Sequence, residues 1–414
     1  MLSILLGVLH LGGDSMRAGR KQRSLDVCFL AYLFAVGCTS SGTSGNTDAA
    51  GLTDGGDGDL AMATCSPEGV FDGAPVTAAA GQWAWVDEPK ALCRDGSATG
   101  FGVRINPNSD KLVIYFQGGG ACFNSATCGS NPATFNSGTF ALAVLAGGQQ
   151  GIFNQTDSAN PFRDWNAVFI PYCTGDVHAG TATGVTVPGV GAPTNQQFVG
   201  YRNVGYYLKR IIPTFPKVTR VLLTGASAGG FGSMLNYHRV AQAFCPRPVS
   251  LVNDSGPVFQ DAFLAPCLQK RWRQLWNFDA NLPAGCTGCS NADGSGMANY
   301  EKFIGQNYPA QRLGLISSLQ DATISYFLGF GQNNCSAIDG TPGPLPGATF
   351  QAGLIDLRDS LLKPNPNWST YYLTGTTHTY LNNANYSSLT SAGVKLTDWM
   401  IGIANQGPSS HVAP

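Results

Sequence analysis

Five consecutive residues, Gly225-Ala-Ser227-Ala-Gly229, place a serine between residues without bulky side chains, directly after the apolar run Val221-Leu-Leu-Thr224. A serine on a tight strand-to-helix turn needs such neighbours, because its strained backbone packs closely against the following helix. The pattern is typical of a nucleophile in acyl transfer. Glycine is abundant here, with 53 of 414 residues, so the surrounding residues must carry the rest of the argument.

A nucleophilic serine needs a base to take its proton and an acid to orient that base. Of the five histidines, two lie near the chain ends. His238 falls on the helix expected after Ser227, about three turns along it, and at roughly 1.5 Å per residue it is too far along the axis to reach the hydroxyl. His178 lies in a glycine-rich loop and can line a pocket. His378 follows a late apolar run, which favours it as the base.

The expected chain order of nucleophile, acid and base places the acid between Ser227 and His378. Two aspartates fit. Asp254 follows the next apolar run after the serine, and Asp321 lies further along the chain, where such acids are more often found. Asp321 can also be read as a carboxylate that stabilises a helix N-terminus. The residues by themselves leave both aspartates open.

The loop Gln117-Gly-Gly-Gly-Ala-Cys122 directly follows the apolar run Lys111 to Phe116. Glycines at that position let backbone N–H groups point into a site without Cβ obstruction, as in the oxyanion loop of esterases. The amide of Ala228, the residue after the serine, is the expected second source of donors. The two glycine-rich patterns that bind phosphate groups, GxxxxGK(S/T) and GxGxxG, do not fit these residues.

Short continuous apolar runs alternate with segments of helical character, which predicts a three-layer α/β fold with a mainly parallel sheet. We expect one domain over residues 65–414, with long glycine-rich loops that shape a binding site. The expected strands are 111–116, 167–170, 220–224, 250–252 and 369–374, and the expected helices are 203–212, 230–244, part of 308–328 and 394–403.

The charge balance excludes a nucleic-acid partner, since 24 Lys+Arg meet 25 Asp+Glu and no basic run occurs in the body of the chain.

Near the start, basic residues and a short apolar stretch precede Cys38, which predicts an export signal over 1–38 with Cys38 as a lipidation site. We expect translation to begin at Met16. Residues 39–64 are rich in Gly, Ser, Thr and Asp, as in a disordered linker. The ten cysteines that follow predict disulfides, and Cys286 and Cys289 fit neither a zinc site nor a redox pair well.

Several segments together resemble the pectin acetylesterase family of Notum-like carboxylesterases, in the family's order and over nearly the whole expected domain. They are 91–97, 116–122, 160–162 with 165–166, 171–173, 225–230, 254–256, Asp321 and His378.

The resemblance implies an α/β-hydrolase fold and no metal or organic cofactor. It implies a triad of Ser227, Asp321 and His378, and an oxyanion hole made by the amides of Gly119, Gly120 and Ala228. It also implies the disulfides Cys122 to Cys128 and Cys93 to Cys173. The chain departs from the family at Gly120 and Ala121, where many members carry a bulky aromatic residue, and at Thr379, where most carry cysteine. The pocket wall should therefore differ.

We expect an exported, surface-anchored bacterial serine carboxylesterase that removes an acetyl group from a polysaccharide such as pectin. Its partners would be an ester substrate and, through the lipid anchor alone, a membrane; we expect a monomer. Two alternatives are a lipid or aliphatic polyester esterase and a non-catalytic carbohydrate-binding lipoprotein that uses tryptophans as stacking platforms. The candidates for substrate contact are His178, Ala121 and Tyr380, and the candidate platforms are Trp83, Trp85, Trp272 and Trp276.

Overall fold

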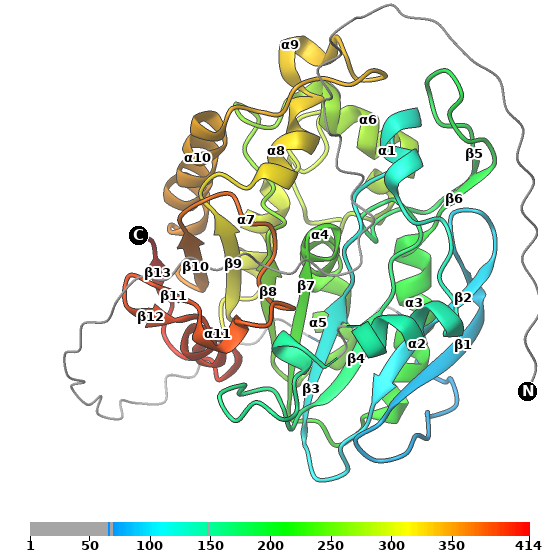
Figure 1. Cartoon of the computed structure of the whole chain (residues 1–414), viewed down its shortest axis with the longest axis vertical. Helices are drawn as coiled ribbons and strands as arrows, with labels where there is room; N and C mark the ends of the chain where they lie inside the picture. Colours follow the sequence, from blue (N-terminus) through cyan, green and yellow to red (C-terminus); the bar gives the residue numbers. More distant parts are fainter. Residues whose placement is uncertain (1–64, 67–68, 147–148) are drawn as a thin grey trace, which may run out of the picture. The chain divides into compact units, whose positions relative to one another are not determined.

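The computed structural model describes residues 65–66, 69–146 and 149–414. Their centre is a nine-stranded sheet in the order β1-β2-β4-β3-β7-β8-β9-β10-β13, which Figure 1 shows from one edge to the other. Seven of these strands, β4, β3, β7, β8, β9, β10 and β13, run parallel to one another, and β2 pairs antiparallel with both β1 and β4. The strands are β1 Trp83–Leu92, β2 Ala98–Arg104, β3 Lys111–Phe116, β4 Asn166–Ile170, β7 Arg220–Ala226, β8 Val249–Asp254, β9 Leu313–Ser318, β10 Trp368–Leu373 and β13 His411–Val412.

The central strands are buried on both faces, which is why they appear in the sequence as continuous apolar runs. Successive residues of β3 alternate between two cores: Leu112 and Ile114 face one, Val113 and Tyr115 the other. Helices cover both faces, so the predicted three-layer α/β architecture is confirmed. The helices are α1 Ser125–Ser130, α2 Ser137–Ala146, α3 Gly200–Thr214, α4 Ala228–Leu235, α5 Tyr237–Phe244, α6 Pro266–Trp276, α7 Asn299–Asn307, α8 Ala322–Gly329, α9 Gln332–Cys335, α10 Gly347–Asp356 and α11 Leu396–Ala404.

The helix expected over part of 308–328 is present as α8, but the strand that precedes it was not predicted. Residues Leu313–Ser318 form β9, and only Ala322–Gly329 are helical. All six residues of β9 are buried, and a short apolar run of that length has no periodicity that separates strand from helix. The sequence analysis also missed β1 and β2 at the antiparallel edge, and the single helix expected at 230–244 is two, α4 and α5, which meet at Asn236.

Five disulfides join the ten cysteines of the described chain. Cys93–Cys173 and Cys122–Cys128, which the family resemblance implied, are both formed. The others are Cys65–Cys245, Cys267–Cys335 and Cys286–Cys289. Cys286 and Cys289 therefore bond to each other. Cys38 and the segments 1–38 and 39–64 lie outside the described residues. Within the described ranges, no helix combines the length and apolar character needed to cross a bilayer.

Candidate active site

Ser227 lies on the turn between β7 and α4, at the carboxyl end of the parallel strands. Its φ of 60° and ψ of -125° are unusual for a residue with a side chain, as expected of a nucleophile elbow. The turn is tight enough to require its glycines. A Cβ on Gly225 would lie 2.2 Å from the carbonyl oxygen of Gly229, and one on Gly229 would lie 1.9 Å from that of Phe116. The small residues of the motif thus have a steric cause.

His378 follows β10, and its Nδ1 lies 2.7 Å from Oδ2 of Asp321. Asp321 is fully buried at the start of α8, where its Oδ1 accepts hydrogen bonds from the amides of Thr323 and Ile324 at 2.9 Å each. Asp321 therefore caps the helix with one oxygen and faces the imidazole with the other. Because a carboxylate only accepts, Nδ1 of His378 carries the hydrogen and Nε2 presents a lone pair.

Nε2 of His378 is buried and has no hydrogen-bond partner among the described residues. Ser227, Asp321 and His378 follow β7, β9 and β10, which are neighbours in the sheet together with β8. The structure joins Asp321 and His378 directly. It forms no hydrogen bond between Ser227 and His378 within the described chain, and such bonds are often longer in substrate-free enzymes.

Asp254, the other candidate acid, has a different set of contacts. Its Oδ2 accepts the amide hydrogens of Tyr380 and Leu381 at 2.7 and 2.9 Å, and its Oδ1 accepts from the hydroxyl of Ser255 at 2.9 Å. Burial raises the pKa of Asp254, and these hydrogen bonds offset the rise only in part. Asp254 thus holds the backbone just after His378, whereas Asp321 contacts the imidazole itself.

The glycine loop after β3 passes close to the serine turn. A Cβ on Gly118 would lie 2.4 Å from the carbonyl oxygen of Ala226, so only glycine fits there. Gly120 has a φ of 78°, which also favours glycine. The amides of Gly119 and Gly120 donate no hydrogen bond to any described residue. The amide of Ala228 belongs to the first turn of α4, where N–H groups lack a partner within the helix. All three are available donors.

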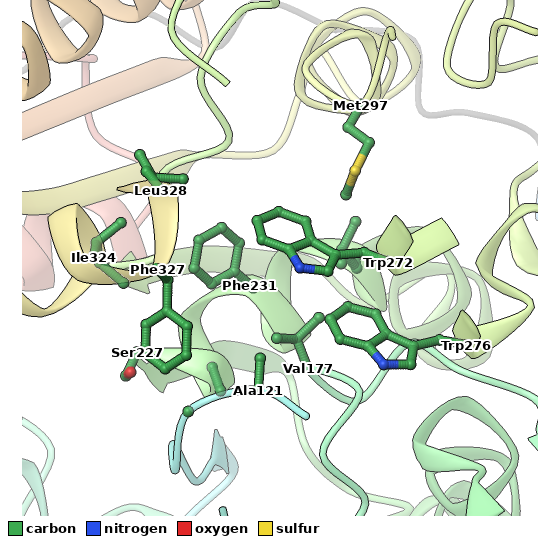
Figure 2. Close-up of a pocket in the computed structure, with 13 residues that line it drawn as sticks. Ala121, Val177, Ser227, Phe231, Trp272, Trp276, Met297, Ile324, Phe327 and Leu328 are labelled. Carbon is green, nitrogen blue, oxygen red and sulfur yellow. The ribbon is translucent and has the colours of Figure 1, made fainter. Parts of the chain in front are cut away.

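A pocket opens beside Ser227 and encloses about 520 Å³ of empty space, counting the part that is open to solvent. Apart from Ser227 and the glycine backbone, its wall is apolar or aromatic. Trp272 and Trp276 stack with ring centroids 6.0 Å apart, and Trp276 Nε1 donates to the carbonyl of Cys122. Figure 2 shows Met297 and the two indoles on the side away from Ser227. The lining residues are Gly120, Ala121, Val177, Ser227, Ala228, Phe231, Leu235, Trp272, Trp276, Met297, Ile324, Phe327 and Leu328.

Of the three residues expected to contact substrate, only Ala121 lines this pocket. His178 is 2 % exposed, lies against Phe116 and Tyr172, and its Nε2 bonds to the carbonyl of Gln117 at 2.8 Å. Burial lowers the pKa of His178 to about 4, so the ring is neutral and structural. Tyr380 is buried and its hydroxyl bonds to that of Ser318. Neither side chain lies on the pocket wall, because the position of a residue in a loop does not reveal which way its side chain points.

The four tryptophans proposed as stacking platforms divide into two pairs. Trp83 and Trp85 are partly buried and pack against Phe140, which belongs to the core on the other face of the sheet. Trp272 and Trp276 instead line the pocket. The sequence analysis considered these two tryptophans of α6 only as carbohydrate-stacking platforms, and it assigned no pocket role to α8. No motif marks either helix, since the wall is assembled from segments far apart in the chain.

Comparison with known proteins gives both sequence and structural matches. The family described as "PAE: Pectinacetylesterase" matches residues 78–306, which is more than half of the chain. The palmitoleoyl-protein carboxylesterase notum2 of Xenopus laevis is 31% identical over 156 residues, which cover 36% of this chain and 30% of that protein. The NOTUM protein of Schmidtea mediterranea is 33% identical over 157 residues, covering 36% and 28%. The alignments thus span less than a third of these relatives.

Among solved structures, the Wnt deacylase Notum from Drosophila matches in two crystal forms. One has a TM-score of 0.55 at 20% identity and covers 80% of this chain and 95% of that chain. The other has a TM-score of 0.54 at 21% identity and covers 81% and 95%. At this identity the likeness establishes the fold, which is that of the α/β hydrolases.

Proposed function

Since the chain belongs to the pectinacetylesterase family, we propose that it is a serine carboxylesterase with Ser227 as nucleophile, His378 as base and Asp321 as the orienting acid. The observation that carries the proposal is the 2.7 Å bond between Asp321 and His378, at the same sheet edge as a serine with positive φ. This arrangement supports the roles of an acyl-transfer triad for three residues that are far apart in sequence.

In the proposed reaction, Ser227 Oγ bonds to the ester carbonyl carbon while its proton passes to Nε2 of His378. The carbonyl electron pair moves onto oxygen, and the amides of Gly119, Gly120 and Ala228 stabilise that negative charge. The imidazolium, oriented by Asp321, then protonates the departing alcohol. A water deprotonated by His378 then attacks the acyl carbon of the acyl-enzyme. The bond from that carbon to Ser227 Oγ breaks, Oγ takes the proton back from His378, and the acid is released.

The pocket favours an aliphatic acyl group longer than acetyl. Its wall beside Ser227 is apolar, so it can remove a hydrocarbon chain from water but offers an acetyl group little specific contact. The relatives are named as palmitoleoyl-protein carboxylesterases, which supports the same reading. We therefore place the acyl chain of the substrate between Ser227 and the indoles of α6.

Deacetylation of a polysaccharide such as pectin is the second candidate, favoured by the pectinacetylesterase description of the matching family. A series of p-nitrophenyl esters from acetyl to palmitoyl separates the two. An acyl pocket predicts that kcat/KM rises with chain length, because each buried methylene contributes about 0.8 kcal/mol. A steep fall beyond butyryl, together with acetate release from acetylated pectin, would favour the second candidate.

Substitution of the nucleophile tests the chemistry itself. Ser227→Ala should abolish turnover of every ester that the parent cleaves, and should remove covalent labelling by a fluorophosphonate. Thermal unfolding of the variant should match that of the parent. A variant that still hydrolyses esters at the parental rate would exclude Ser227 as nucleophile, and a parent that is never labelled would favour the non-catalytic carbohydrate-binding alternative.

We further propose that the protein is an exported monomer, with the catalytic domain at 65–414 joined by the linker 39–64 to a lipidated Cys38. The five disulfides support an oxidising compartment. Mass spectrometry of the mature N-terminus tests the anchor: a diacylglyceryl group on Cys38 is expected, and Cys38→Ser should release the enzyme from the membrane fraction.

A further inference from the structure

The glycine loop after β3 is held through its carbonyl groups by buried side chains. The carbonyl of Gly119 accepts a hydrogen bond from Nδ2 of Asn131 at 2.7 Å, and that of Gly120 accepts one from the Tyr172 hydroxyl at 2.8 Å. In a trans peptide the N–H of the next residue points opposite to the carbonyl. The amide of Gly120 therefore points away from Asn131, and Gly120 itself lines the pocket.

Asn131 is in turn held by the guanidinium of Arg94. Nε of Arg94 donates to Oδ1 of Asn131 at 3.1 Å, and Nη2 donates to its backbone carbonyl at 2.6 Å. Arg94 is only 6% exposed and Asn131 only 5%. The Oδ1 contact fixes the amide of Asn131 so that its nitrogen faces Gly119. A continuous chain of hydrogen bonds thus runs from Arg94 through Asn131 to the peptide of Gly119 and Gly120.

The remaining contacts of Arg94 are with neutral acceptors. Nη1 donates to Oε1 of Gln196 and Nη2 to the carbonyl of Cys128, both at 2.6 Å. Arg94 takes part in none of the ion pairs found within the described ranges. A guanidinium stays charged in proteins. No described carboxylate pairs with it directly, although the charge of Asp95 is close enough to act on it. The guanidinium therefore acts mainly on the dipoles to which it donates.

Two disulfides fix this chain of hydrogen bonds at both of its ends. Cys93, next to Arg94, bonds to Cys173, and Cys128, whose carbonyl Arg94 contacts, bonds to Cys122 at the end of the glycine loop. The distance between guanidinium and loop is consequently set by covalent links as well as by hydrogen bonds. Such a chain costs no reorganisation when charge develops in the site.

We propose that Arg94 and Asn131 are positioning residues that orient and polarise the Gly119–Gly120 peptide, so that the Gly120 amide is a stronger donor to the oxyanion. The proposal rests on the proposed function, in which Ser227 forms a tetrahedral oxyanion. Hydrogen bonds in a chain strengthen one another by roughly 10–30% each. Because the negative charge exists only in the transition state and intermediate, the gain falls on kcat rather than on KM.

A trifluoromethyl ketone carrying the acyl chain of the best ester tests this directly. Ser227 Oγ adds to the ketone carbon, the serine proton passes to His378, and the ketone oxygen becomes an oxyanion in the site. The matched trifluoromethyl alcohol occupies the same space without forming that charge. The ratio of the two inhibition constants measures oxyanion stabilisation and is insensitive to changes in acyl binding.

For Asn131→Ala we expect that ratio to fall about tenfold, less than the 10²–10³ cost of losing an oxyanion donor outright. kcat should fall equally and KM stay unchanged. Arg94→Lys keeps a cation but loses the fork that holds Asn131, and should change the ratio in the same direction. Gln196→Met is the control, because it removes one hydrogen bond of the same guanidinium. The bonds from Arg94 to Asn131 and from Asn131 to Gly119 remain.

The proposal would be overturned if Asn131→Ala or Arg94→Lys folds with lower stability but leaves the ratio of inhibition constants unchanged. It would also be overturned if Gln196→Met lowers that ratio as much as these variants do. If Asn131→Ala does not fold, Arg94→Lys and Asn131→Asp are read by the same ratio. Failure of the proposed function is separate: the parent would then show no fluorophosphonate labelling and no preference for the ketone over the alcohol.

Discussion

Asp321 lies 2.7 Å from His378 although 57 residues separate them in the chain. Two amides of α8 hold one oxygen of the carboxylate and so fix the direction in which the other oxygen points. The imidazole occupies that direction. The helix cap and the proposed catalytic acid are therefore the same side chain.

Asp321→Asn should lower kcat by roughly 10³- to 10⁴-fold, the cost of presenting a base in the wrong tautomer. The amide oxygen of the variant can still cap α8, so its NH₂ group would face Nδ1. The imidazole must then carry its hydrogen on Nε2, where it cannot accept the proton of Ser227. Steady-state kinetics with the best p-nitrophenyl ester measure the loss, and a parental kcat in the variant would refute the assignment of Asp321.

Asp254 should be needed for the position of His378 but not for its chemistry. Asp254→Ala leaves the buried amides of Tyr380 and Leu381 without an acceptor, which costs about 1–3 kcal/mol for each group. We expect a lower melting temperature and at least a tenfold loss of kcat. The matched variant Asp254→Asn can still accept both amides and donate to Ser255, so its kcat should stay within a few-fold of the parent. If Asp254→Asn is as inactive as Asp321→Asn, the two roles have been exchanged.

Filling the pocket at Met297 should shorten the acyl chain that the enzyme accepts. Met297 is buried and lies on the pocket wall away from Ser227. Met297→Trp should lower kcat/KM for palmitoyl and dodecanoyl esters by roughly 10–100-fold, equivalent to a few excluded methylenes, with little effect on acetyl esters. Met297→Leu conserves volume and is the control. Equal losses on acetyl and palmitoyl esters would mean that the chain does not enter here.

Glu301 should make the protein less stable as the pH rises. It is fully buried in α7, and burial raises its pKa to about 8, although the amide of Val258 opposes the rise. Between the unfolded pKa of 4.5 and this value the unfolded chain has lost a proton that the folded chain keeps. Unfolding therefore releases a proton, and stability falls with pH, by about 4 to 5 kcal/mol at most.

Glu301→Gln should abolish this contribution, because its side chain does not titrate. Denaturant unfolding of both proteins at several pH values checks the prediction. His178 acts in the opposite sense, since its pKa of about 4 makes stability rise with pH up to the unfolded value of 6.5. It is common to both proteins and cancels in the difference. Identical slopes of stability against pH above pH 5 would contradict the prediction.

The sequence predicted the central strands, because strands buried on both faces appear as continuous apolar runs bounded by turn residues. It also predicted the serine turn. Glycines are required there, because a Cβ at Gly225 or Gly229 would lie 2.2 Å or less from a backbone oxygen. The short supply of histidines left His378 as base by elimination. The antiparallel strands β1 and β2 were missed, as was β9, because a brief apolar run alone does not specify its secondary structure.

Tertiary structure decided everything that depends on which way a side chain points. It separated Asp321 from Asp254, two aspartates that both follow sheet strands, because only the sheet order and the path of the loop after β10 determine which carboxylate reaches His378. It buried His178 and Tyr380 away from the wall of the pocket beside Ser227. It also assembled the apolar pocket from α4, α6, α8 and three loops, and a surface built from residues so far apart in the chain leaves no local pattern in the sequence.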